Sequence, residues 1–278
     1  MKIIALDGVD GCGKSYLADK LVNHLSSLGL NVIKAKFPDN NYLTGKNIYD
    51  LLFTEDKINL GEYNPFATWM LYAVNRHEWF INHKKETHNA IIVCDRYVSS
   101  IAFQIYTLIS KIYSFENKNK FLEDFSFDND LFSILTFNKT FNIDCIYSDA
   151  TKTNNFLSDL FGYDDSALLC SFSKAIDFMM FFEYNILKTP VPDIEIVIKA
   201  HKSYINKNLS NKDKDMFEKD PNISLREKIY DYMAKKFNYI TIFNRFSEDG
   251  TEELKDIFSY LRIHPEFEFI NYINNNAI

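Results

Sequence analysis

The sequence predicts an α/β fold in which helices cover both faces of a parallel β-sheet. Short apolar runs alternate with longer helical patterns along the 278 residues, as in folds built from repeated strand–helix units. The apolar runs are nearly continuous, which is typical of strands that are buried on both faces. A hydrophobic share of 46% supplies enough apolar material for one large core. We therefore expect a single domain over residues 1–278.

The expected elements follow from these runs in order. The first helix is expected from residue 14 to about residue 27, because leucines recur every fourth residue on one face (Leu17, Leu21 and Leu25). Gly29 then ends it before the second strand. Residues 106–170, approximately, fit no core pattern and form an inserted segment in which we expect helices. Five strands are expected, at residues 2–6, 32–36, 91–94, 194–198 and 239–243.

Composition excludes several classes of protein. The formal net charge of -7 argues against a broad electrostatic grip on nucleic acid. No apolar run reaches the roughly 20 residues of a membrane span. The chain enters a strand-like segment at once, with no basic and apolar leader, so we expect a cytoplasmic protein. The cysteines show no CxxC or metal-ligand spacing and are interpreted as free thiols: Cys12, Cys94, Cys145 and Cys170.

A glycine-rich segment follows the first strand. Residues 8–15, GVDGCGKS, match G-x-x-x-x-G-K-[ST], which is a P-loop. Its glycines let backbone N–H groups turn toward phosphate oxygens, Lys14 reaches the β and γ phosphates, and Ser15 Oγ ligates Mg²⁺. The helix that follows directs its positive end at the same anion. The expected ATP contacts are Gly8, Gly11, Cys12, Gly13, Lys14, Ser15 and Leu17.

Three further segments follow the P-loop in order. FPDN at residues 37–40 comes after the second strand, and NRHE at residues 75–78 lies late in a helical stretch. DRY at residues 95–97 opens a run to Gln104 at the carboxyl end of the third strand, where open α/β sheets bind ligands. With these segments the chain closely resembles the thymidylate kinases, whose pattern is DGxGKS, FPxR, NRxE, DRYxxSSxAYQ and a lid with D-x-[YF]-E. The resemblance covers residues 1–105 and about 187–260.

The resemblance implies both an architecture and a reaction. The implied fold is a P-loop kinase with a five-stranded sheet of order 2-3-1-4-5 and a lid at about residues 206–222. The implied reaction is transfer of the γ-phosphoryl group of ATP to dTMP with Mg²⁺, in a homodimer. Adenine is expected near residues 244–251, after the last strand. The inserted segment enters close to the base pocket and to the usual dimer face, and it could reshape either.

The resemblance also assigns roles to single residues. Arg96 is expected to clamp the acceptor phosphate, since a guanidinium donates two parallel hydrogen bonds. Asp95 is expected near Mg²⁺, and Asp10 at the sugar 3′-hydroxyl. Arg76 is expected to read the edge of thymine, while Tyr72 stacks on the ring. Further expected substrate contacts come from Phe37, Tyr97, Ser100, Gln104 and Glu218.

The chain departs from the family pattern at two places. Asn40 stands where FPxR has arginine, and such a change removes a charge-assisted contact worth about 1.5–3 kcal/mol. Lys36 and Lys46 are the candidates to compensate. The P-loop carries no arginine, so the transition-state cation must come from the lid, which holds lysines instead. The lid lysines are Lys207, Lys212 and Lys214, and we hypothesise that Lys212 is the main contributor, with Lys214 next.

Three alternatives stay open at this point. A deoxynucleoside kinase would need a general base that deprotonates a sugar 5′-hydroxyl. This calls for a carboxylate near the end of the second strand, and Asp39 lies there. A monophosphate kinase that also accepts dUMP is a closer variant, because one methyl group gives only about 1–3 kcal/mol of discrimination. The third is a nucleotide-binding regulator without turnover, which would bind ATP and release no ADP with any acceptor.

Overall fold

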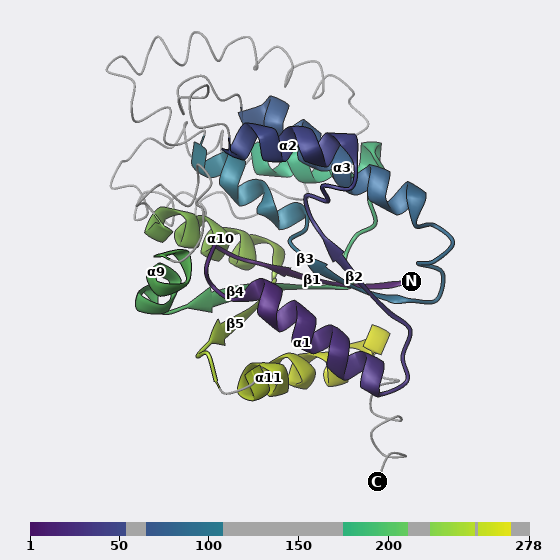
Figure 1. The fold of residues 1–278 in the computed structure, drawn as a ribbon, viewed down its shortest axis with the longest axis vertical. Coiled ribbons are helices and arrows are strands. Elements are labelled where there is room, and N and C mark those ends of the chain that lie inside the picture. The colour runs from purple at the N-terminus through teal and green to yellow at the C-terminus, as the bar shows by residue number, and fades with distance from the viewer. Residues whose placement is uncertain (54–64, 108–174, 211–222, 248–249, 268–278) are drawn as a thin grey trace.

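The five predicted strands form one parallel sheet. The structure, a computed structural model, describes residues 1–53, 65–107, 175–210, 223–247 and 250–267 (Figure 1). The strand order is β2-β3-β1-β4-β5, which confirms the predicted order. Every predicted strand end lies within two residues of the observed one. The strands are β1 (Lys2–Asp7), β2 (Val32–Lys36), β3 (Ile91–Asp95), β4 (Ile194–Ala200) and β5 (Ile240–Asn244).

Helices cover both faces of the sheet (Figure 1). One face carries α1 (Lys14–Ser27), whose bounds are those predicted, and α11 (Thr251–Ile263). The other face carries α2 (Leu43–Phe53), α3 (Pro65–Asn82) and α10 (Ile223–Phe237). The shorter elements are the 3₁₀ turn η1 (Val98–Ile101), the π-helical turn η3 (Phe182–Ile186), α9 (Lys202–Ser210) and the 3₁₀ turn η5 (Pro265–Phe267).

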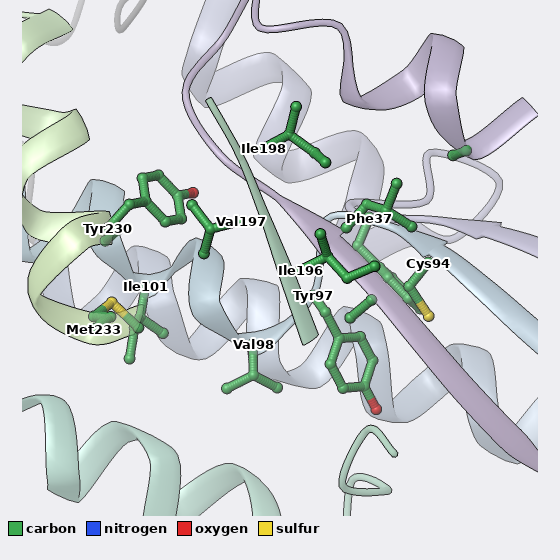
Figure 2. Packing of buried hydrophobic residues seen from close by; sticks show 14 of the residues in the cluster. Phe37, Cys94, Tyr97, Val98, Ile101, Ile196, Val197, Ile198, Tyr230 and Met233 are labelled. Carbon is green, nitrogen blue, oxygen red and sulfur yellow. The ribbon is translucent and has the colours of Figure 1, made fainter. Parts of the chain in front are cut away.

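The central strands explain the continuous apolar runs. β3 is buried at every position, and β1 at every position but its first, because helices cover both of their faces. The edge strand β5 alternates between buried and more exposed residues. Figure 2 shows Tyr230 and Met233 pointing from α10 into the same apolar cluster as Ile101 and Val197. The core thus binds α10 to the segment that follows β3.

The carboxyl edge of the sheet gathers the segments that the motifs singled out. β1 leads into the P-loop, β3 into DRY, and β4 into α9, which opens the lid. Most of the predicted insertion (108–170) and most of the predicted lid (211–222) lie outside the described residues. Among the helices that the structure describes, none is both long enough and apolar enough to cross a membrane.

Candidate active site

The P-loop backbone is shaped by its glycines. Gly8 has φ 141° and Gly13 has φ 91°, conformations that residues with a Cβ rarely adopt. A Cβ at Gly8 would overlap the carbonyl oxygen of Ile198, and one at Gly13 would overlap the amide of Asn244. The first turn of α1 carries no acidic side chain, so its positive end faces the loop uncompensated. This arrangement is an anion cradle.

Lys14 folds back across the cradle. Its Nζ donates a 3.0 Å hydrogen bond to the carbonyl of Val9 and lies 3.7 Å from Asp10 Oδ1. The lysine is 5% exposed, whereas Ser15 beside it is exposed. A phosphate in the cradle would therefore meet a fixed ammonium and an open hydroxyl.

Arg96 directly follows β3, the neighbour of β1 in the sheet, and is fixed beside the cradle. Its backbone adopts φ 70°, unusual for a residue with a side chain, and its N–H donates to the Leu6 carbonyl at 2.9 Å. The guanidinium donates to Asp10 Oδ1 and lies 3.7 Å from Asp7 Oδ1. Burial alone would lower the pKa of Arg96, but Asp10 and the neighbouring carboxylates hold it well above its ordinary value. Asp10 thereby gains a charge partner, which explains a carboxylate inside an anion cradle.

Asp7 is a structural centre of the site that the sequence reasoning missed. Its buried carboxylate accepts hydrogen bonds from Tyr97 N–H at 3.0 Å and from the hydroxyls of Ser99 and Ser100 at 3.0 and 2.8 Å. The Tyr230 hydroxyl, from α10, donates to Asp7 Oδ1 at 2.7 Å. One carboxylate therefore joins β1, the segment after DRY and α10. In the sequence, only its position at the end of the strand before the P-loop could have indicated that Asp7 belongs to the site.

Asp95 fits the predicted place of a divalent cation. The residue is 1% exposed, and its Oδ2 is buried without a hydrogen bond from the residues that the structure describes. A buried carboxylate oxygen of this kind suits a hydrated Mg²⁺, whose other protein ligand would be the Ser15 hydroxyl. The described residues hold no group of three or more His, Cys, Asp or Glu side chains that could bind a metal by itself.

Most of the residues predicted to contact the base are buried, and Arg76 and Ser100 already have partners within the protein. Arg76 is 1% exposed and pairs through two nitrogens with Glu183 of η3, with Nε 2.7 Å from Oε2. Trp69 Nε1 also donates to Glu183, at 3.0 Å. The Ser100 hydroxyl donates to Asp7, Gln104 is buried, and Tyr72 is partly buried against the core. Leu17, Phe37 and Tyr97 have core side chains, so their predicted ligand contacts stay predictions.

The expected adenine loop is anchored to the P-loop. Asn244 donates from Nδ2 to the carbonyl of Cys12 at 2.8 Å and accepts from Phe246 N–H at 2.8 Å. Tyr204 of α9 stacks on Phe246, with ring centroids 4.8 Å apart. Asn208, one turn later, donates to the Gly11 carbonyl at 2.8 Å. The start of the lid, the loop after β5 and the P-loop therefore form one connected group.

Comparisons with known proteins agree with this geometry. A family model described as thymidylate kinase matches residues 6–128. The thymidylate kinase of Finegoldia magna is 30% identical over 165 residues, which span 55% of this chain and 77% of that protein. The chain belongs to the thymidylate kinase family. The lid residues Lys212, Lys214 and Glu218 lie outside the described residues, so their predicted roles are not placed.

Other thymidylate kinases match shorter stretches. A probable thymidylate kinase of Saccharolobus solfataricus is 37% identical over 110 residues, 37% of this chain and 50% of that protein. The chain thus spans about half the length of the first curated relatives that it matches. The structure of thymidylate kinase from Candida albicans superposes with a TM-score of 0.55 over 95% of this chain and 93% of that chain. At 18% identity, that likeness supports the fold.

This member of the thymidylate kinase family lacks the FPxR arginine, and the structure shows what surrounds its replacement. Asn40 is exposed, as are Lys36 and Lys46, the two lysines considered as compensation. The Asp39 carboxylate, considered as a base for the alternative reaction, accepts from Asn41 N–H at 2.9 Å and from its side-chain amide at 2.8 Å. Asp39 therefore stabilises the turn that leads into α2.

A second buried acid lies beneath the site. Both carboxyl oxygens of Glu195, on β4, are buried and accept no hydrogen bond of ordinary geometry from the described residues, although Ser99 and the Tyr239 hydroxyl lie close enough to interact with them. The Tyr184 hydroxyl also lies buried nearby. Burial, with Asp7 adding to it, raises the pKa of Glu195 to about 8, despite lowering by Ser99 and Arg76. Below pH 8 this side chain is therefore mostly neutral in the folded protein.

Glu195→Gln is expected to remove a pH dependence of stability. Because the folded pKa lies above the unfolded value of 4.5, Glu195 stabilises the fold fully below pH 4.5, and this is lost as pH rises to about 8. The loss amounts to about 1.4 kcal/mol per pH unit over this window. Urea unfolding at pH 5, 6.5 and 8 should show that the free energy of unfolding of the variant rises relative to that of the wild type as pH increases. Parallel curves for the two proteins would contradict a raised pKa.

Proposed function

We propose that the protein transfers the γ-phosphoryl group of ATP to dTMP. The observation that carries the proposal is that Lys14 and Arg96, the cations proposed for the donor and the acceptor phosphate, meet at one carboxylate at the carboxyl edge of the sheet. Lys14 lies 3.7 Å from Asp10, and Arg96 donates to the same carboxylate oxygen. A donor phosphate in the cradle and an acceptor phosphate at Arg96 would therefore lie side by side, as in-line transfer requires.

Catalysis in this site rests on positioning and charge. The attacking phosphate oxygen is already anionic, so no strong general base is needed. Lys14 neutralises the β and γ phosphates, and Arg96 orients the acceptor with two parallel donors. Ser15 and Asp95 are the residues that would hold Mg²⁺, and the ion would supply positive charge against the charge that develops on the phosphates. Closure of a lid that carries Lys212 and Lys214 would exclude water.

The finer assignments are part of the same proposal. Arg76 and Tyr72 are proposed to contact the base, and Asp10 the sugar. Acceptance of dUMP beside dTMP is proposed as well, since only a methyl group separates the two substrates. The product would serve DNA precursor synthesis in the cytoplasm. The homodimer that the resemblance implies stays a prediction.

ADP release with Mg·ATP tests the proposal. The acceptors to compare are dTMP, dUMP, dCMP, dGMP, thymidine and a blank without acceptor. We expect turnover with dTMP, with dUMP within about 100-fold of it. Turnover with thymidine alone would instead make Asp39 the catalytic base of a deoxynucleoside kinase. ATP binding without ADP release under any condition would favour the regulator.

A further inference from the structure

The Tyr230 side chain contacts two of the groups that hold Arg96 in place. It is 1% exposed and points from α10 toward the sheet (Figure 2). Its hydroxyl donates to Asp7 Oδ1 at 2.7 Å, and the same oxygen lies 3.7 Å from Arg96 Nη1. Its ring packs edge-on against Phe103, with centroids 6.2 Å apart, and the guanidinium carbon of Arg96 lies 4.7 Å from the centroid of the Phe103 ring. One side chain therefore supports both a charged and an aromatic neighbour of Arg96.

The Tyr230 hydroxyl is the donor in its bond to Asp7. Burial raises the pKa of this hydroxyl well above its ordinary value, and Asp7 adds to the effect, although Arg96 lowers it. The phenol therefore stays protonated at neutral pH. A hydrogen bond from a hydroxyl to a carboxylate is charge-assisted, and such bonds are roughly twice as strong as bonds between neutral groups. Tyr230 thus fixes the place of the Asp7 carboxylate from the side of α10.

Asp7 attracts Arg96 by charge without a hydrogen bond between them. The 3.7 Å between Oδ1 and Nη1 is too long for one. Asp7 Oδ1 instead accepts from the Tyr230 hydroxyl, from the Ser100 hydroxyl at 3.0 Å and from Gly8 N–H at 2.9 Å. Without the Tyr230 hydroxyl this buried oxygen would lose a donor, and the guanidinium is placed to replace it. Arg96 would then turn toward Asp7 and away from an incoming phosphate.

We infer that Tyr230 is a positioning residue that keeps Arg96 directed at the acceptor phosphate. Its hydroxyl satisfies Asp7, so the guanidinium is left for the phosphate, and its ring fixes Phe103, on which the guanidinium rests by cation–π contact. The inference rests on the proposed function, in which Arg96 binds the acceptor. It adds a residue from α10, a helix that none of the family motifs includes.

A double-variant cycle tests whether Tyr230 acts through Arg96. Tyr230→Phe removes only the hydroxyl. We expect it to lower kcat/KM for dTMP by about 10-fold, because a hydrogen bond to a charged acceptor is lost, and to change the KM for ATP by less than about 3-fold. In an Arg96→Met background the same change should cost less than about 2-fold, since no guanidinium is left to position. Tyr260→Phe, on α11, removes an exposed hydroxyl and should change neither constant in either background.

Each other outcome overturns a defined statement. A loss of the same factor in both backgrounds would give Tyr230 a purely structural role and overturn the inference. Unchanged kcat/KM for dTMP in Tyr230→Phe would also overturn it and leave the proposed function intact. Full turnover of dTMP by Arg96→Met would overturn the clamp on which the inference rests, and a wild type that never turns over dTMP would overturn the proposed function as well.

A second variant covers the case in which Tyr230→Phe does not fold, which thermal unfolding would show. Phe103→Leu removes the ring between Tyr230 and Arg96 and keeps the hydroxyl bond to Asp7. It enters the same cycle and should lower kcat/KM for dTMP more in the wild type than in Arg96→Met. Equal losses in the two backgrounds would overturn the inference here too.

Discussion

Replacing Arg96 with methionine is expected to lower kcat/KM for dTMP by about 10³-fold. The guanidinium is held at a fixed place by Asp10, by the Phe103 ring and by a backbone at φ 70°. A group fixed in this way aligns the acceptor phosphate without reorganising during the reaction. Arg96→Lys should lose about 10²-fold, because an ammonium keeps the charge but cannot fork between two oxygens. Steady-state kinetics with dTMP and ATP varied in turn would measure both.

The KM for ATP distinguishes this role from a general loss of structure. Lys14 and the glycine cradle are proposed to hold the donor, and Arg96 reaches them only through Asp10, so the KM for ATP should rise by no more than about 10-fold. Arg262→Met, which removes an exposed arginine from the last turn of α11, serves as the matched control, with wild-type constants expected. Turnover of dTMP by Arg96→Met within about 10-fold of wild type would contradict the clamp.

The fold and the cradle could be predicted because their signals are local. Each central strand is a short run whose burial on both faces leaves it apolar at nearly every position. The P-loop motif contains its glycines, Lys14 and Ser15 within eight residues, because a phosphate is bound there by one turn and the start of one helix. Helix α1 was predicted with its observed bounds because its leucine spacing and Gly29 both lie in the same short stretch.

The polar networks behind the site could not be predicted, because their partners are distant in sequence. Asp7 meets Tyr230 across 223 positions and Ser100 across 93. Arg76 meets Glu183 across 107 positions. In the sequence, Asp7 looks like any acid at the end of a strand, and Glu183 lies just beyond a segment with no readable pattern. Only the packing of α10 against the sheet and of η3 against α3 brings these side chains together.

Glu183→Met is expected to lower the free energy of unfolding by about 3–5 kcal/mol. Glu183 and Arg76 are 0% and 1% exposed, and Glu183 is the acceptor for two Arg76 nitrogens and for Trp69 Nε1. Burial alone would lower the pKa of Arg76, and the Glu183 carboxylate more than offsets this. Without that carboxylate, a buried guanidinium loses its counter-charge and two hydrogen-bond acceptors. Urea unfolding of each variant gives the free energies.

The double variant Arg76→Met with Glu183→Met should recover most of this loss. Replacing both members of a buried ion pair with apolar side chains of similar volume is often neutral, whereas removing one member is not. The remaining deficit should be about 1 kcal/mol, from the Trp69 N–H that loses its acceptor. Trp69→Phe is the matched control, because it removes that hydrogen bond and keeps the ion pair. A double variant whose loss equals the sum of the two single losses would show that the pair is not coupled.

The same double variant separates the two roles of Arg76. If Arg76 also reads the base, as proposed, a double variant of near wild-type stability should still bind dTMP poorly. If Arg76 serves only as the counter-ion of Glu183, stability and dTMP affinity should recover together. The ion pair then determines which face of the guanidinium is available, because Glu183 already takes Nε and one terminal nitrogen. The other terminal nitrogen, 3.5 Å from the Tyr97 carbonyl, is the donor left for an acceptor atom of the base.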